Sequence, residues 1–237
     1  MQLVAQRGLS FDDRHARLQE SLDFILKCWT SDAIFDWDGK YWKGKGVVAL
    51  PKPLSVPHMP MATATDTELV IKMCAQRGYT LLSAFLEDAE RVRTKADRYV
   101  SYAAEAGVTG ARRNITTSRV VYVADSYEVA LEDLRPSVTY EISIQPERGF
   151  LKVIKKLLNL DIPNDARGID VLADAGFYLL GEPDRIAGQI KDFYDASGGF
   201  GTFLVVPGKD WATREQLARS MTRFMEEVAP QLRRLHD

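Results

Sequence analysis

The stretch Pro60-Met61-Ala62-Thr63-Ala64-Thr65-Asp66-Thr67 decides how this chain is organised, because it predicts a short buried strand that runs directly into a helix. Asp66 and Thr67 are residue types that favour the first, capping position of a helix. The helical pattern follows over residues 68–77 and stops at Gly78, a residue type common just after a helix. A strand end that meets a helix start offers backbone N–H groups and a positive dipole end. The stretch is therefore a candidate anion site, with an ordinary capped strand–helix turn as the alternative.

The overall composition is that of an ordinary globular protein. The chain has 237 residues, of which 46% are hydrophobic and 27% charged, enough for one large domain or two small ones. A net charge of -2 gives no reason to expect nucleic acid or an acidic membrane as a partner. No apolar run approaches the length of a membrane span, and the first residues do not resemble a signal peptide.

The cysteines and histidines carry no metal or disulfide signal. Cys28 and Cys74 each lie within an apolar helical pattern, which predicts two buried free thiols and a cytoplasmic location. The three histidines share no ligand spacing, so we expect no metal site.

Working outward from residues 60–67, helical and strand patterns alternate along the chain. Helices are expected at 10–29, 68–77, 87–106, from 125, from 182 and at 214–235, strands at 60–67, 79–84, 114–124, 177–180 and 202–206, and an aromatic hairpin at 34–42. Helices that alternate with strands predict a parallel sheet with helical crossovers, so the fold class is α/β.

Residues 136–176 interrupt this alternation. Pro136 is expected to interrupt the helix that begins at 125, and residues 138–142 fit neither a helix nor a strand clearly. Residues 150–160 predict a basic amphipathic helix, for which a packing or lid role is favoured over a membrane-surface role. An insertion of this length inside such a series typically covers a binding site, so residues 136–176 are expected to form a helical lid.

Chemistry is expected at the carboxyl ends of the strands, where parallel α/β proteins place their sites. The glycine-rich segment 198–201 precedes its strand, whereas phosphate-binding glycines follow a strand, so it is not expected to bind a cofactor. The carboxylate pair Glu87 and Asp88 is expected on a solvated helix face. The remaining candidates for a functional site are the carboxyl ends of the strands, at residues 63–67, 83–85, 124–126 and 206–211.

In their order and spacing these segments resemble the bacterial luciferase-like flavin-dependent monooxygenases, with most similarity to the limonene monooxygenase branch. The residues that carry the resemblance are 14–29, 35–42, 50–53, 60–78, 180–184, 197–204 and 210–211. The family fold is a (β/α)8 TIM barrel that binds reduced FMN, or in some branches F420, at its carboxyl-end face. The resemblance begins before the fifth strand, which implies a partial TIM barrel: strands 5–8 with their helices plus the helical insertion, in one domain over residues 1–237.

The resemblance also implies roles for individual residues. Thr67 matches the hydroxyl residue that contacts the flavin phosphate, and Thr63, Thr65 and Asp66 are its neighbours along the cofactor. No catalytic residue can be carried over, because the family's catalytic histidine and a phosphate-binding arginine lie in the first four strands. A flavin reductase would supply the reduced cofactor.

Three aromatic residues are candidates to line a pocket for a small apolar substrate: Phe85, Phe177 and Trp211. A core position for Phe177 is an equal alternative. Two functional hypotheses follow. The chain is part of a monooxygenase that is inactive without the first half of the barrel, or it is a non-catalytic flavin-binding or structural half-barrel. Half a barrel leaves two sheet edges open, and a homodimer is one way to close them.

Overall fold

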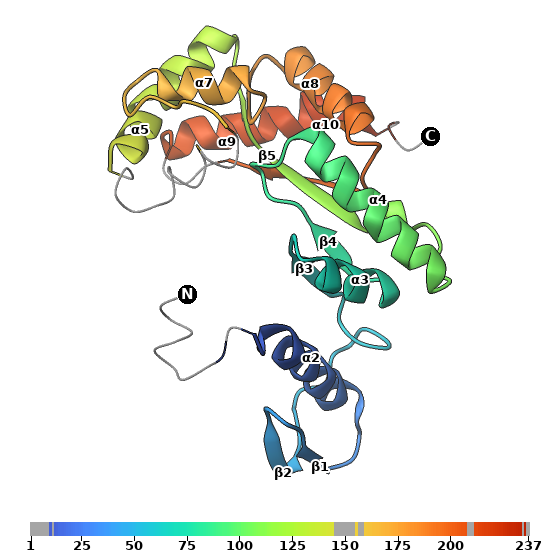
Figure 1. Cartoon of the computed structure of the whole chain (residues 1–237). Helices are drawn as coiled ribbons and strands as arrows, with labels where there is room; N and C mark the ends of the chain where they lie inside the picture. The colour runs from blue at the N-terminus through green and yellow to red at the C-terminus, as the bar shows by residue number, and fades with distance from the viewer. Residues whose placement is uncertain are drawn as a thin grey trace.

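The computed structural model describes residues 10, 12–144, 155, 159–207, 211–233 and 235. In chain order the described elements are α2 (Arg14–Thr30), β1 (Phe35–Asp38), β2 (Lys43–Val47), β3 (Ala62–Ala64), α3 (Glu68–Gln76), β4 (Thr80–Leu82), α4 (Ala89–Glu105), the 3-10 turn η1 (Ala111–Asn114), β5 (Ile115–Val123), α5 (Tyr127–Ile144), α7 (Gly168–Asp174), β6 (Tyr178–Gly181), α8 (Pro183–Ala196), β7 (Thr202–Val206), α9 (Arg214–Arg223), the π-helical segment η2 (Phe224–Val228) and α10 (Ala229–Leu232). Figure 1 shows the crossover helices gathered around the long strand β5, with α2 and the β1–β2 hairpin beyond α3. None of the described helices is both long and apolar enough to cross a membrane.

The five strands from β3 to β7 form one parallel sheet, as the alternation predicts. Thr116 of β5 pairs with Leu82 of β4 and with Thr202 of β7, so β4 and β7 lie on opposite sides of β5. Strand β6 pairs with the carboxyl end of β5, beyond the short β4. Side by side, the strands therefore run β3, β4, β5, β7, and in the described residues they do not close into a barrel.

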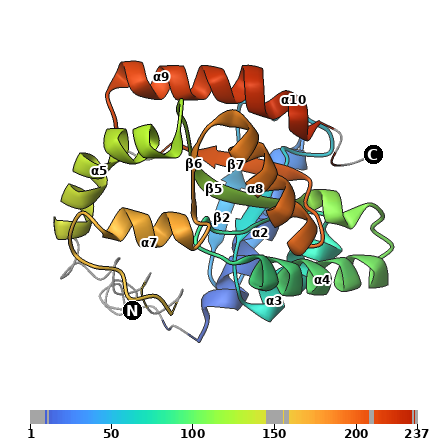
Figure 2. The same cartoon turned by 90° about the horizontal axis from the view of Figure 1, so that it is seen from above.

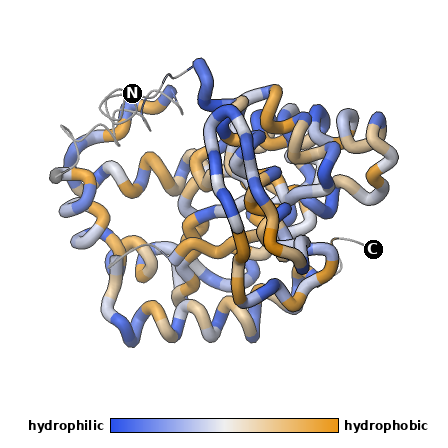
Figure 3. The backbone as a smooth tube through the Cα atoms, turned by 90° about the horizontal axis from the view of Figure 1, so that it is seen from below, coloured by the Kyte–Doolittle hydropathy of each residue, from blue (hydrophilic) through white to orange (hydrophobic). Residues whose placement is uncertain are grey.

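One face of this sheet is covered by α3, α4 and α8, and the residues of β5 on both faces are buried. Ile115 packs beneath α3 and α4, and Val121 and Val123 pack beneath α8. Figure 2 shows α8 lying across β5 when the molecule is viewed from above. In Figure 3, hydrophobic and hydrophilic stretches alternate along the peripheral helices, as one-sided burial requires.

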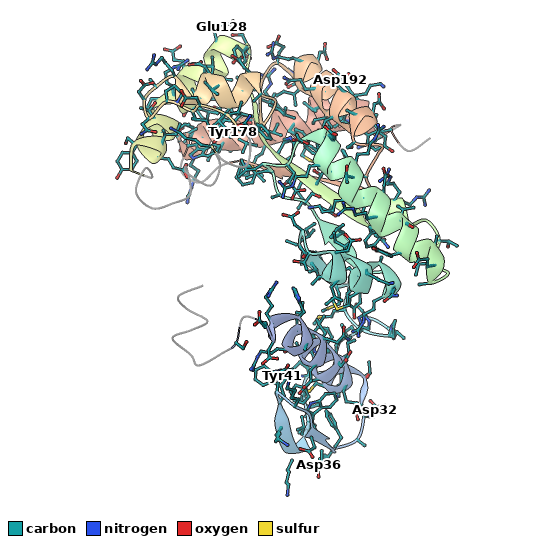
Figure 4. All side chains as sticks on the ribbon, in the orientation of Figure 1. Asp32, Asp36, Tyr41, Glu128, Tyr178 and Asp192 are labelled. Carbon is teal, nitrogen blue, oxygen red and sulfur yellow. The ribbon has the colours of Figure 1, made fainter. Side chains whose placement is uncertain are left out.

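A second apolar cluster, here called the carboxyl-end cluster, lies on the other face around the ends of β5 and β6. Among the described residues, helices α5 and α7 contribute seven of its sixteen buried side chains. Its buried members are Leu86, Val120, Tyr122, Ala124, Ala130, Leu134, Val138, Ile142, Ile162, Ile169, Leu172, Ala173, Phe177, Tyr178, Leu180 and Trp211. Figure 4 labels Tyr178, which lies among the side chains of this upper part of the molecule.

The amino-terminal helix and hairpin hold each other through Glu20 of α2. Its carboxylate accepts backbone N–H groups of Tyr41 and Trp42 at 2.8–3.1 Å, and these hydrogen bonds lower the pKa of Glu20 against the opposing effect of desolvation. The Tyr41 hydroxyl also donates to Asp13 at 2.9 Å, where it lowers the pKa of that carboxyl. The hairpin prediction is confirmed, but the second strand begins at Lys43 rather than within residues 40–42.

Two local expectations are wrong. Strand β3 is not buried: Ala62 and Ala64 are exposed and Thr63 is half-buried, because β3 lies at the edge of the described sheet. Pro136 does not end its helix, since α5 runs from 127 to 144 and residues 138–142 are helical. Val138 and Ile142 are buried, so tertiary packing outweighs the proline.

Most of the predicted amphipathic helix at 150–160 lies outside the described residues, as do residues 208–210. Helix α7 is a short helix within this insertion that ends just before Gly176. The lid role of residues 136–176 stays a prediction.

The glycine-rich segment has a packing role, as expected from its position before a strand. A Cβ at Gly201 would lie 1.8 Å from the backbone oxygen of Arg113, the third residue of η1. The Gly201 N–H donates to the Ile115 carbonyl at 2.9 Å. Only glycine permits this close approach of two chain segments.

Candidate functional site

The loop after β3 places its hydroxyl groups at the amino-terminal end of α3. Thr67 occupies the capping position with extended backbone (φ -84°, ψ 122°), but its side chain makes no capping hydrogen bond. Instead the Thr65 hydroxyl accepts the Thr67 N–H at 3.0 Å. The Thr67 carbonyl accepts the N–H groups of Val70 and Ile71 at 2.9 and 3.0 Å. Helical bonding thus begins at Val70, and the N–H groups of Glu68 and Leu69 precede it, as at every helix start.

Thr63 faces a different direction from the loop hydroxyls. Strand alternation puts it on the helix-covered face, opposite to Ala62 and Ala64. There it hydrogen-bonds the buried thiol of Cys74 on α3. Burial raises the pKa of the Cys74 thiol, and the bond with Thr63 partly opposes this rise. The structure therefore brings Thr65, Asp66 and Thr67 together in one loop and places Thr63 beneath α3.

Asp66 connects this loop to α4. Its carboxylate lies 2.9 Å from Arg91 and 3.4 Å from Lys95. Lys95 also lies 2.6 Å from Glu87, and both of these side chains are only 6% exposed. The expectation that Glu87 lies on a solvated helix face is wrong, because this carboxylate is folded inward to pair with Lys95 and to accept the Ala84 N–H at 3.0 Å.

The polar chain continues from Glu87 to Arg119 in the middle of β5. Arg119 is 2% exposed and donates to the Glu87 carbonyl at 2.6 Å and to the Ser118 carbonyl at 2.7 Å. Its guanidinium lies 3.8 Å from the centre of the Phe193 ring and 5.6 Å from that of Phe177. Desolvation lowers the pKa of Arg119 to about 10, against the attraction of Glu87. We call Lys95, Glu87 and Arg119 the buried polar network; the exposed carboxylate of Asp66 contacts it at the surface.

A cleft of about 410 Å³ lies between the loop after β3 and α4. Its lining residues are Asp66, Ile71, Asp88, Glu90, Arg91, Thr94, Lys95 and Arg98, three cations against three carboxylates. Arg98 is itself 3.0 Å from Glu68, in the first turn of α3. The cleft is therefore balanced in charge, so attraction for an anion at this loop would come from the α3 N–H groups and the threonine hydroxyls.

The three predicted substrate residues all belong to the carboxyl-end cluster or pack against it. Phe177 and Trp211 are buried, at 5% and 7% exposed, and Phe85 is half-buried. The Trp211 ring lies 5.1 Å from Tyr178, and its indole N–H donates to Glu141 of α5. The structure thus places all three aromatic residues in or against one apolar cluster, with Phe177 and Trp211 in core positions. Their binding role stays a prediction.

Sequence reasoning missed the buried polar network. One signal was available: Arg119 is a charged residue in the middle of a strand of β-branched and small residues. A cation at such a position requires buried acceptors. Which acceptors it finds depends on the folding of 85–88 against β5 and could not be read from spacing.

The sheet is parallel with helical crossovers, and a hydroxyl-bearing loop opens into a helix at the carboxyl end of one strand. These features define an α/β protein of the TIM-barrel class with its candidate site at the strand ends. Solved structures support this class. The monooxygenase RslO1 from Streptomyces bottropensis matches with a TM-score of 0.75 and 21% identity over 97% of this chain and 65% of its own. The oxygenating constituent of 3,6-diketocamphane monooxygenase from Pseudomonas putida, solved in complex with FMN, matches with a TM-score of 0.71 and 22% identity over 92% of this chain and 63% of its own.

The chain belongs to the family described as luciferase-like monooxygenase, whose family model matches residues 2–199. Limonene 1,2-monooxygenase from Rhodococcus erythropolis is 29% identical over 176 residues, which cover 71% of this chain and 42% of that protein. An F420-dependent glucose-6-phosphate dehydrogenase from Nocardia farcinica is 24% identical over 95% of this chain and 63% of its own length. The chain thus spans about two fifths to two thirds of the relatives it matches. The predicted family and the predicted partial-barrel fold class are confirmed.

Proposed function

We propose that this chain is the flavin-phosphate-binding part of a monooxygenase that uses reduced FMN and dioxygen to oxygenate a small apolar molecule. Membership of the luciferase-like family supports flavin chemistry. The observation that carries the proposal is the loop 65–67, where two hydroxyl groups and the first N–H groups of α3 converge. This is the combination that holds a phosphate at a strand end.

The residues of the loop fit a phosphate group, with one feature that must be offset. Glu68 places a carboxylate in the first turn of α3, where it opposes a second anion. Its charge is met by Arg98 at 3.0 Å and by the Tyr102 hydroxyl. Thr67 would donate its hydroxyl to the phosphate, and the N–H groups of Glu68 and Leu69 would point toward it. When bound, reduced flavin supplies the electrons with which dioxygen is activated.

The apolar character of the substrate rests on the carboxyl-end cluster. Phe85, Phe177 and Trp211 lie in or against this cluster together with side chains of α5 and α7, so residues 136–176 would exclude water from the reacting groups. A flavin reductase would deliver the reduced cofactor. The rest of the barrel would supply the catalytic groups.

The experiment is a titration of the purified chain with FMN and, in parallel, with riboflavin, which lacks the phosphate. We expect FMN to bind more tightly, and Thr67→Val to weaken FMN binding about 10-fold or more, since a hydrogen bond to a charged group is worth about 1.5–3 kcal/mol. Riboflavin binding should not change. Thr30→Val, at the exposed end of α2, is the matched control. Equal affinities of the wild type for the two flavins would refute the phosphate site.

Two alternatives are separated by the same approach. F420 replaces FMN in some relatives, including the Nocardia farcinica dehydrogenase, so a tighter response to F420 than to FMN would reassign the cofactor. A non-catalytic flavin-binding role is tested by supplying reduced FMN, ¹⁸O-labelled dioxygen and a panel of terpenes and cyclic ketones. Label in the product supports oxygenation. If the chain binds flavin but no ¹⁸O enters any product, even after the first half of a relative's barrel is added, the result supports the non-catalytic role.

A further inference from the structure

The loop between β3 and α3 has few backbone contacts that fix its place on the sheet. The last paired residue of β3 is Ala64, and helical hydrogen bonding begins at the Thr67 carbonyl. Between these points, within the described ranges, the backbones of Thr65 and Asp66 form no hydrogen bond to another element. The bond from the Thr67 N–H to the Thr65 hydroxyl is internal to the loop. Side chains must therefore connect this loop to its surroundings.

The Asp66 carboxylate makes that connection, to helix α4. One of its oxygens accepts a hydrogen bond from Arg91 at 2.9 Å, and the other accepts one from Lys95 at 3.4 Å. Arg91 and Lys95 lie one turn apart on α4, so they hold the carboxylate at two points. Helices α3 and α4 lie side by side (Figure 1). Both oxygens of Asp66 are thus engaged by α4.

One of these two cations is itself fixed to the sheet. Lys95 is 6% exposed and lies 2.6 Å from Glu87. The Glu87 carboxylate accepts the Ala84 N–H at 3.0 Å, and its own N–H donates to the Ala84 carbonyl at 3.1 Å. Arg119 of β5 then donates to the Glu87 carbonyl at 2.6 Å. The contact of Asp66 with Lys95 therefore ties the loop after β3 to the turn after β4 and to the long strand β5.

We propose that Asp66 is a positioning residue of the loop 65–67, which it holds in place for phosphate binding through Arg91 and Lys95. The identity of the anion rests on the proposed function. The role differs from a direct contact with the cofactor, because a carboxylate repels a phosphate and both oxygens of Asp66 are engaged by α4. A loop that is already ordered loses less conformational freedom when a ligand binds, so the ligand binds more tightly.

The sign of the effect of Asp66→Asn separates positioning from simple charge. If the carboxylate acted only by its charge, its removal would strengthen the binding of a phosphate nearby. Positioning predicts the opposite, because a neutral amide holds the two cations less well and the loop is in its binding arrangement for a smaller fraction of the time. Asp66 and Arg91 are 57% and 40% exposed. An exposed ion pair shifts such an equilibrium by up to about fivefold, so FMN should bind about fivefold more weakly.

The first test needs no flavin and measures amide hydrogen exchange of the full chain by mass spectrometry of its peptides. In Asp66→Asn the amides of residues 65–69 should exchange about fivefold faster than in the wild type, and those of β5 should be unchanged. Glu90→Gln removes a carboxylate that lines the same cleft from α4, and is the matched control with wild-type exchange in the loop. Equal loop exchange in Asp66→Asn and the wild type would overturn the proposal, as would faster exchange over the whole chain.

The second test is titration of the same variants with FMN and with riboflavin. Asp66→Asn should bind FMN about fivefold more weakly and riboflavin unchanged. Asp66→Glu keeps the charge that Arg91 and Lys95 hold and should recover most of the FMN affinity, and Glu90→Gln should bind FMN at least as tightly as the wild type. Unchanged or tighter FMN binding by Asp66→Asn would overturn the role of Asp66 in phosphate binding.

Failure of the proposed function gives a different result. Equal affinities of the wild type for FMN and riboflavin would refute the phosphate site itself, and with it the role of Asp66 in phosphate binding. The exchange measurement on the flavin-free chain would then still decide whether Asp66 holds the loop.

Discussion

The buried ion pair between Lys95 and Glu87 gives the most discriminating prediction about this fold. The charged atoms lie 2.6 Å apart and both side chains are 6% exposed. At an effective dielectric constant of ~20 their Coulomb attraction is about 6 kcal/mol, which offsets several kcal/mol of desolvation for each ion. Lys95→Met removes the cation and leaves the Glu87 carboxylate buried. We therefore expect the free energy of unfolding to fall by about 3–5 kcal/mol.

The assay is urea denaturation followed by circular dichroism, with two reference variants. Lys191→Met breaks a pair with Asp195 whose side chains are 60% and 59% exposed, and should cost less than about 1 kcal/mol. The double variant Lys95→Met with Glu87→Leu replaces both charges by apolar groups and should recover most of the loss. If Lys95→Met lowers the free energy of unfolding no more than Lys191→Met does, the Lys95–Glu87 pair is not buried in solution. The buried polar network would then not connect the loop after β3 with the segment 85–88.

Three further predictions follow from packing and ionisation. Gly201→Ala forces a Cβ onto a backbone carbonyl of η1, so it should lower the melting temperature and cost about 1–3 kcal/mol in the free energy of unfolding. Gly188 on α8 has open space where a Cβ would lie, so Gly188→Ala should raise the free energy of unfolding by about 0.5–1 kcal/mol. In a Cys28→Ser background, which removes the half-buried second thiol, the Cys74 thiol should react with a disulfide reagent only at the rate of unfolding, because it is buried. The reaction is followed by absorbance, and rapid reaction in buffer would contradict the burial of Cys74. The hydrogen bonds of Arg135 lower the pKa of Asp170 in the folded protein. The stabilisation that this pair gives the folded state should therefore be present above the unfolded-state pKa of ~3.9 and be lost as the pH falls below it. Asp170→Asn should flatten the dependence of the free energy of unfolding on acid pH, and an unchanged slope would exclude a contribution of the pair to stability.

The local signals in the sequence were sufficient for most elements. The strand at 115–123, the helix ends at Gly78 and Gly107, and the proline in the first turn of α8 all follow from residues close together in the chain. The same is true of the loop 65–67, whose hydroxyl groups lie at the start of α3 as predicted. The proline in α5 misled because burial of Val138 and Ile142 against α7 and β6 outweighs one lost helical bond.

By itself the sequence determined the α/β alternation, the family and the candidate phosphate loop, because periodicity, capping residues and the order of motifs are properties of neighbouring residues. Only the tertiary structure decided that β3 is an edge strand of the sheet in the described residues, that Thr63 turns toward Cys74, and that Glu87 and Lys95 pair in the interior. Each of these depends on which strands and helices become neighbours in space. A side chain's environment is set by those neighbours, and residue type and spacing along the chain do not specify them.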